Sequence, residues 1–197
     1  MQDNKTDNIT PTTGLPDEAL YAEFLTTGDN GAFRKLLERY REPLTLFIFS
    51  IVRSMDDAED IMLDAFAVAA SGTVKFKGKS SFKTWLFAIG RNLALKYLRK
   101  NRLVMLPIDD EVSEKASNAL LPDEELLKTE RDRKLYEALD KLNPDYRQAL
   151  TLHFFEGMDA EQIAVVMDKN KKQVYNLIER GKEQLKTKLA ALGITEP

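Results

Sequence analysis

Apolar residues recur at spacings of three and four along most of the chain, which is the pattern of amphipathic helices. No alternating pattern of a strand persists and glycine is scarce, so the sequence predicts an all-α fold. In the first half, helices are expected from an N-cap at Asp17, from about Gly31 to Val52, from near Met55 to Ala69, and from Phe82 to Asn101. A Gly- and Lys-rich loop is expected between the last two, from Ser71 to Ser80.

The helical pattern resumes in the second half at Leu126. Asn143 followed by Pro144 predicts the start of a helix, and Glu156-Gly157-Met158 predicts its end. Asp159 is expected to cap a short helix, and a last helix is expected from about Lys171 to Leu192, stopped by Gly193. The chain is therefore expected to hold two small helical domains, the second with a helix-turn-helix, joined by an acidic flexible linker bounded by two prolines.

Charge is strongly segregated, although the 197 residues carry a formal net charge of only −3. Residues 65–108 contain nine Lys and Arg residues and no acid, whereas residues 109–130 are strongly acidic. Local charge, more than net charge, decides whether a surface attracts phosphates. The basic stretch is therefore a candidate nucleic-acid surface.

Residues 159–180 have the pattern of a helix-turn-helix, with Ala164, Met167, Val174 and Ile178 expected at the crossing of its two helices. The second helix would present polar and basic side chains that can bind base edges and phosphates. These candidates are Lys169, Lys171, Lys172, Gln173, Tyr175, Asn176 and Arg180. A plain helical hairpin with a solvated basic face is the alternative.

Residues 75–102 interleave aromatic rings with the nine cations. Cations gain by releasing counterions from phosphates, and aromatic faces stack on bases that have left the duplex. This combination indicates a surface for single-stranded DNA, although rings at helical spacing also suit a core. The candidates are Lys75, Lys77, Lys79, Phe82, Lys83, Trp85, Arg91, Asn92 and Lys96.

An acidic cluster begins the third expected helix, and Asp57, Asp60 and Asp64 share one of its faces. The spacing could hold a hard metal ion, but no second acidic helix or histidine accompanies it, so a docking face or simple solvation is favoured. The chain has no cysteine, and its single histidine, His153, has no nucleophile beside it. Without phosphate loops or zinc spacings either, the sequence predicts neither catalysis nor a cofactor or metal.

Two sets of motifs resemble the extracytoplasmic-function (ECF) sigma factors of the sigma-70 family. The first domain's pattern is matched by Asp57-Ala58-Glu59-Asp60-Ile61, Phe82-Lys83-Thr84-Trp85-Leu86 and Ile89-Gly90-Arg91-Asn92. The second domain's pattern is matched by Ala138-Leu139, Arg147, Glu156-Gly157, Glu161-Gln162-Ile163-Ala164 and Arg180. The chain departs from the family at the turn, where Asp168 and Lys169 replace glycine and an apolar residue, and at Gly181, which replaces alanine.

The resemblance implies a role for each part of the chain. Residues 17–103 would bind core polymerase and the minus-ten element, and residues 126–192 the minus-thirty-five element. Residues 104–125 would be the linker, 1–16 a disordered segment and 193–197 a tail. Asp56, Asp57, Asp60 and Asp64 would dock on the polymerase. The nine candidates of residues 75–96 would hold and melt minus-ten DNA, and the seven of residues 169–180 would bind the minus-thirty-five element.

The resemblance implies promoter DNA and core polymerase, at its clamp and flap, as partners, with an anti-sigma factor as regulator. It implies a cytoplasmic protein, in agreement with the absence of cysteine, of a signal peptide and of a long apolar segment. Two other functions stay open on the residues alone. One is a free-standing helix-turn-helix regulator, and the other is a module that binds an acidic protein partner.

Overall fold

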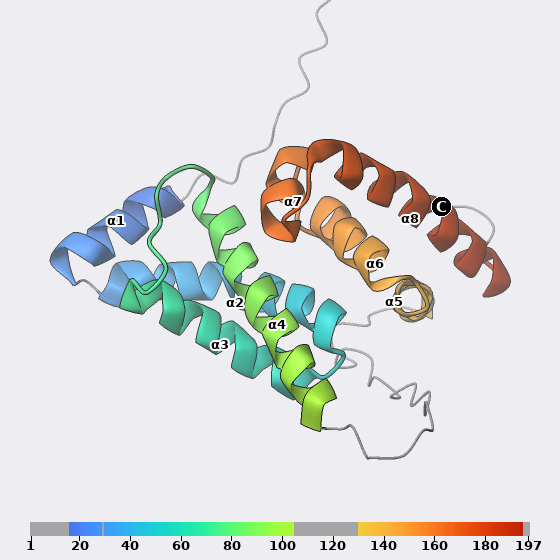
Figure 1. Cartoon of the computed structure of the whole chain (residues 1–197), viewed down its shortest axis with the longest axis horizontal. Helices are drawn as coiled ribbons and strands as arrows, with labels where there is room; N and C mark the ends of the chain where they lie inside the picture. Colours follow the sequence, from blue (N-terminus) through green and yellow to red (C-terminus); the bar gives the residue numbers. More distant parts are fainter. Residues whose placement is uncertain (1–15, 29, 105–129, 195–197) are drawn as a thin grey trace, which may run out of the picture.

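The computed structural model describes residues 16–28, 30–104 and 130–194, and within these it contains helices and no strand (Figure 1). The predicted all-α fold is thereby confirmed. The predicted linker lies outside the described residues, apart from Val104. The helices are α1 (Asp17–Thr27), α2 (Asn30–Val52), α3 (Met55–Ser71), α4 (Phe82–Val104), α5 (Glu130–Asp140), α6 (Pro144–Leu150), the π-helical turn η1 (Thr151–Phe155), α7 (Ala160–Met167) and α8 (Lys171–Ala191).

Helices α1 to α4 pack together and bury the apolar face of each (Figure 1). At the centre, Leu44 and Ile48 of α2 lie against Gly90 of α4. A Cβ atom on Gly90 would lie 2.9 Å from Cδ1 of Leu44, so glycine permits the close crossing of these two helices.

Helices α5 to α8 form the second half, in which α8 crosses α6 closely. A Cβ atom on Gly181 would lie 3.1 Å from Cγ of the buried Leu150. The glycine that departs from the family pattern therefore stands where α8 approaches α6. The helix-turn-helix of α7 and α8 is present, with Ala164, Met167, Val174 and Ile178 buried as expected.

The apolar residues of both halves form one continuous cluster. Helix α4 packs against α7, and α2 packs against α6 and η1 (Figure 1). Each half therefore covers part of the other.

Most predicted helix ends are confirmed. Asn143 and Asp159 cap α6 and α7 with their side chains, and Gly193 follows α8 with a positive φ of 81°. Asp17, in contrast, is not an N-cap: Pro16 holds that position, and Asp17 is the first helical residue. Its carboxylate instead pairs with Arg39 and accepts a hydrogen bond from Tyr40, both on α2. This contact between helices competes with capping, and the sequence pattern gives no sign of it.

Candidate nucleic-acid interface

An aromatic cluster holds the loop of residues 72–81 against α1 and α4. Tyr21 of α1 lies 5.9 Å from the Phe76 ring and 5.4 Å from the Trp85 ring, and Phe76 lies 5.2 Å from Trp85, between ring centroids. The indole Nε1 of Trp85 is buried and has no hydrogen-bond partner among the described residues. An unpaired buried donor costs free energy, and a ligand atom could reach this one only if the side chains around it moved.

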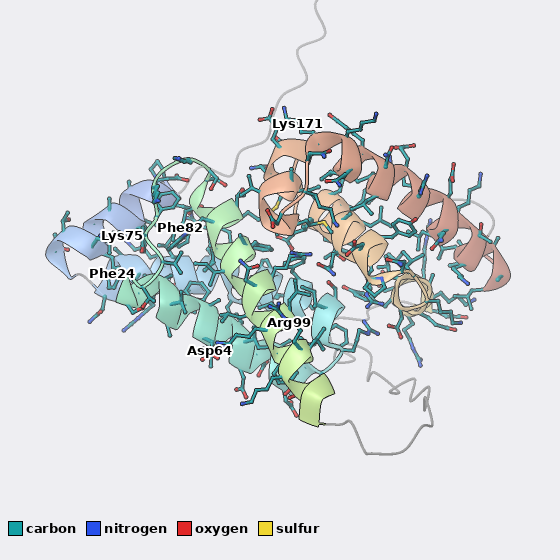
Figure 2. The ribbon with its side chains drawn as sticks, in the orientation of Figure 1. Phe24, Asp64, Lys75, Phe82, Arg99 and Lys171 are labelled. Atoms are coloured by element: carbon teal, nitrogen blue, oxygen red, sulfur yellow. The ribbon has the colours of Figure 1, made fainter. Side chains whose placement is uncertain are left out.

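The three lysines of the loop, Lys75, Lys77 and Lys79, are exposed. Phe82, by contrast, is 0% exposed and lies inside the bundle (Figure 2). Its ring cannot contact DNA in this arrangement, so its contribution to a minus-ten site would be to position the loop and the start of α4.

The polar candidates of α4, three cations and Asn92, divide into two groups. Asn92 and Lys96 are exposed. Lys83 lies half-buried, with its Nζ 2.9 Å from Oε2 of Glu156 and donating to the Glu156 carbonyl at 2.8 Å. Arg91 is only 8% exposed, and its Nε donates a 2.8 Å hydrogen bond to Oε1 of Gln148. Helix α4 therefore turns part of its basic face toward the second half.

The acidic cluster lies on the outer side of α3. Asp56, Asp60 and Asp64 are exposed, and Asp57 is half-buried beside Tyr97 of α4. Burial, together with the hydrogen bond to Asp57, raises the pKa of Tyr97. No group of three or more acidic or histidine side chains in the described parts of the chain is arranged to hold a metal ion. The face offers negative charge to a basic partner.

Two capping boxes set the geometry of the helix-turn-helix: Asp159 with Gln162 begins α7, and Asn170 with Gln173 begins α8. Oε1 of Gln173 accepts a hydrogen bond from the backbone N–H of Asn170 at 2.9 Å, so this oxygen already has a partner within the fold. Between the helices, Asp168 takes the left-handed conformation with φ of 53°. The aspartate that departs from the family pattern thus adopts the backbone that glycine usually supplies.

The outer face of α8 is free for a ligand. Tyr175 is 59% exposed, and Lys172, Asn176 and Arg180 are exposed beside it. Lys171 is exposed (Figure 2) and pairs with Glu161, whereas the half-buried Lys169 lies 3.1 Å from a carboxylate oxygen of Asp145. Lys169 is therefore the least exposed of the seven candidates.

The contacts between the halves were missed by sequence reasoning. Nε of Arg147 donates a 2.7 Å hydrogen bond to the carbonyl of Ser50, and Arg53 pairs with Asp140. Burial lowers the pKa of Arg147 to about 10. Arg147 and Ser50 are 97 residues apart, and no local pattern in the sequence marks them as partners.

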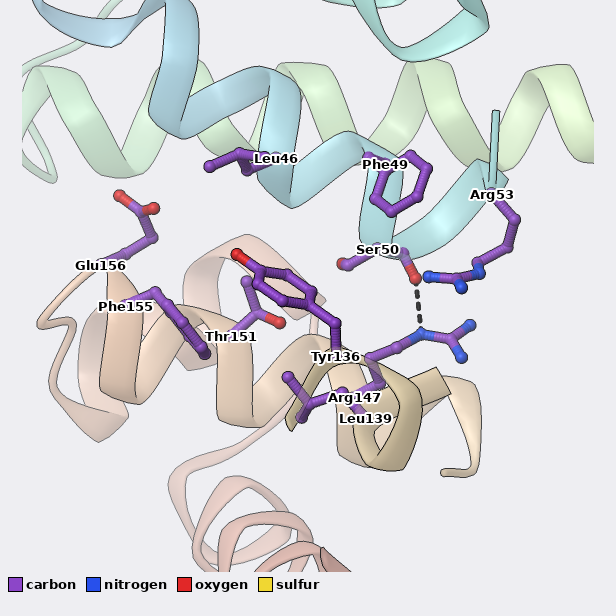
Figure 3. Close-up of a pocket in the computed structure, with 10 residues that line it drawn as sticks. All are labelled: Leu46, Phe49, Ser50, Arg53, Tyr136, Leu139, Arg147, Thr151, Phe155 and Glu156. Carbon is purple, nitrogen blue, oxygen red and sulfur yellow. Dashed lines mark hydrogen bonds between the residues drawn. The ribbon is translucent and has the colours of Figure 1, made fainter. Parts of the chain in front are cut away.

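A pocket lies at the interface between the two halves, with α2 on one side and α5 and η1 on the other (Figure 3). Its walls include Leu46, Phe49, Tyr136 and Phe155, and the Arg147–Ser50 hydrogen bond closes one end. The packing between the halves is thus incomplete at this point.

None of the helices in the described ranges is long and apolar enough to cross a membrane.

Two family models match the chain: sigma-70 region 2 over residues 36–104 and sigma-70 region 4 over residues 132–185. The ECF RNA polymerase sigma-E factor of Haemophilus influenzae is 31% identical over 187 residues, which cover 90% of this chain and 97% of the relative. The sigma-E factor of Escherichia coli K12 is 30% identical, over 90% of this chain and 96% of the relative. The ECF sigma factor SigX of Bacillus subtilis is 28% identical, over 81% and 84% of the two chains.

Two solved structures share the fold. CnrH, in complex with the cytosolic domain of CnrY, superposes with a TM-score of 0.66 and 23% identity, over 89% of this chain and 97% of CnrH. RpoE of Bartonella quintana, in complex with the anti-sigma factor NepR, gives 0.62 and 24%, over 80% of this chain and 96% of RpoE. The two sigma-E factors align with this chain over nearly the full length of each relative, at 31% and 30% identity, and these relatives show the family. The chain belongs to the ECF sigma factors of the sigma-70 family.

Proposed function

We propose that this chain binds core RNA polymerase through the acidic face of α3, directs it to specific promoters and helps to open their DNA. The observation that carries the proposal is the separation of three exposed surfaces on one fold. These are the acidic face of α3, the basic loop beside the Trp85 indole, and the outer face of α8. In the proposed role the chain supplies binding energy and no catalysis, and it acts in the cytoplasm with the polymerase.

The loop of residues 72–81 is the proposed site of the melted minus-ten strand. Its exposed lysines attract phosphates, and the half-buried Trp85 ring packs against Phe76 of the loop. Melting by this route needs no hydrolysis, because the cost of a base outside its stack, a few kcal/mol, is offset by the site that receives it.

Helix α8 is the proposed reader of the minus-thirty-five element in the major groove. Asn176 can form paired hydrogen bonds with adenine, and Lys172 and Arg180 can reach guanine or phosphate. Tyr175 is exposed between them, and Val174 and Ile178 anchor the opposite face in the core. An anti-sigma factor is the proposed regulator, since RpoE, which shares the fold, was solved in complex with the anti-sigma factor NepR.

Capture of core polymerase tests the docking face. Asp60→Lys with Asp64→Lys reverses two exposed charges on one face of α3, and we expect capture by the full chain to fall at least tenfold. The matched control, Glu183→Lys with Glu179→Lys, reverses two exposed charges on α8. Capture that survives the α3 reversal would contradict the proposed docking face.

Run-off transcription tests the function itself. Purified chain and core polymerase are incubated with a genomic promoter library, and start sites are mapped. We expect transcripts that share sequence elements upstream of their start sites and that disappear without the chain. If the chain adds no start site above core polymerase alone, the proposed function is wrong and the chain is better explained as a regulator acting without polymerase.

A further inference from the structure

Lys169 lies in the turn of the helix-turn-helix, but its side chain contacts α6 of the same half. Its Nζ lies 3.1 Å from Oδ2 of Asp145, the second residue of α6, and the side chain is 26% exposed. Lys171, the first residue of α8, pairs with Glu161 and keeps 55% of its exposure. Of the two lysines beside the N-cap Asn170, one is therefore half-buried against α6 and the other remains exposed.

The acid that pairs with Lys169 stands on a rigid part of the fold. Asp145 follows Pro144, whose ring fixes its own backbone angle φ. The Asp145 N–H donates a 2.9 Å hydrogen bond to Oδ1 of the N-cap Asn143. The remainder of α6, from Arg147 to Leu150, is buried. The pair therefore ties the turn to the centre of the second half.

Helix α6 also contacts α8 further along. A Cβ atom on Gly181 would lie 3.1 Å from Cγ of Leu150, and Gly181 is about 15 Å along the helix from Lys171. Nearer the turn, α8 packs through the buried Val174 and Ile178, and apolar packing is non-directional. The polar pair at the turn therefore adds a fixed point close to the start of α8, where bases would be read.

We propose that Lys169 is a positioning residue for the reading of promoter DNA, which acts through Asp145 to fix the direction of α8 and neutralises no phosphate. The inference rests on the function proposed above and changes the role of one of the seven candidates. A phosphate contact strengthens binding to any duplex, whereas the direction of α8 decides how well the correct bases are recognised. The two roles therefore differ in which DNA they affect.

Discrimination by the holoenzyme, the full chain with core polymerase, tests the proposal. It is the ratio of two affinities, for a promoter mapped by run-off transcription and for the same promoter with its minus-thirty-five element scrambled. We expect Lys169→Gln to lower this ratio about fivefold or more, which is roughly the loss of one base contact. Binding to the scrambled promoter and the slope of log affinity against log salt should stay unchanged. Lys169→Arg, which keeps a cation for Asp145, should retain the ratio.

Asp145→Asn separates the two roles, because they predict opposite effects. If Lys169 acts through Asp145, loss of the acid lowers discrimination as Lys169→Gln does, and the double variant is no worse than either single variant. If Lys169 contacted a phosphate, its release from Asp145 would instead tighten binding to both promoters. Asp145 also attracts Arg91, so the agreement of the Asp145 and Lys169 variants assigns the effect to their pair.

Lys171 and Glu161 provide the matched control, since their pair flanks the same turn and is exposed on both sides. Lys171→Gln should weaken binding to both promoters and lower the salt slope by about 0.9, the value for one phosphate of a duplex. Glu161→Gln should leave discrimination unchanged.

The outcomes separate the inference from the proposed function. An equal loss of binding to both promoters in Lys169→Gln, with a lower salt slope, overturns the inference while leaving the function intact. Unchanged discrimination in Lys169→Gln, or tighter binding in Asp145→Asn, also overturns it. If the unmodified holoenzyme does not distinguish the two promoters, the proposed reading by α8 is wrong, and the inference that rests on it falls as well.

Discussion

The carboxylate of Glu18 accepts a 2.8 Å hydrogen bond from the backbone N–H of Phe82, 64 residues further along the chain. Phe82 is the first residue of α4, whose initial N–H groups have no partners within the helix. Ser81 satisfies a second of them through its Oγ, which accepts from Thr84 N at 3.2 Å. Helix α1 therefore fixes the start of α4, and with it one end of the basic loop.

Removing this cap should loosen the start of α4. We expect Glu18→Ala to lower the free energy of unfolding by about 1 kcal/mol, since it leaves a helix N–H unpaired and removes a favourable charge from the positive end of the helix. Denaturant unfolding measures the change. Glu23→Ala in the same helix is the control, and an equal loss in both variants would argue against the cap.

The crossing of α2 and α4 should reject a branched side chain at Gly90. Gly90→Val would press against Leu44 and Ile48, which are fully buried, and we expect a loss of about 1–3 kcal/mol from overpacking. Lys100→Val, at an exposed position of the same helix, controls for the lower helix propensity of valine. Thermal unfolding of the two variants should differ clearly, and similar melting temperatures would be evidence against a tight crossing.

The left-handed turn at Asp168 should distinguish substitutions by backbone preference. Asp168→Asn is the reference, because it removes the charge near Arg91 while still tolerating a positive φ. Relative to it, we expect Asp168→Ala to be less stable by about 1 kcal/mol and Asp168→Gly to be at least as stable. Chemical denaturation gives the order, and a reversal of Gly and Ala would contradict the geometry of the turn.

Alkaline pH should destabilise the fold through Tyr40. Burial, first, and the hydrogen bond to Asp17 raise the pKa of Tyr40 well above its ordinary value of 10.0. As pH rises above about 10, the unfolded chain loses this proton while the folded chain keeps it, so stability falls by up to about 1.4 kcal/mol per pH unit. Tyr40→Phe should flatten the decline in unfolding experiments from pH 9 to 11, and an unchanged slope would rule out this origin.

Binding of minus-ten DNA should depend steeply on salt. Replacing Lys75, Lys77 and Lys79 together with Gln should weaken binding and reduce the slope of log affinity against log salt, by up to about 0.7 for each phosphate of a single strand that the chain no longer neutralises. Fluorescence anisotropy of the full chain with fork-junction DNA gives both quantities. The control replaces Lys186, an exposed residue of α8, with Gln. An unaltered slope in the triple variant would count against the loop as a phosphate site.

Local sequence signals predicted the helix ends well where the chain satisfies its own backbone groups. Asn143, Asp159 and Gly193 act where they were expected, because capping involves only neighbours in sequence. Asp17 failed as a cap because Arg39 and Tyr40, on another helix, bind its carboxylate. Phe82 was predicted to contact DNA, whereas packing buries its ring.

The sequence by itself determined the all-helical fold, the helix-turn-helix and the family, because these depend on periodicity, capping and short motifs within one stretch of chain. Only the tertiary structure decided which cations stay exposed and which, such as Lys83 and Arg91, meet partners 73 and 57 residues away. The physical reason is that burial and ion pairing depend on what lies across an interface. Periodicity shows that a face is buried or polar, but not which distant side chain will oppose it.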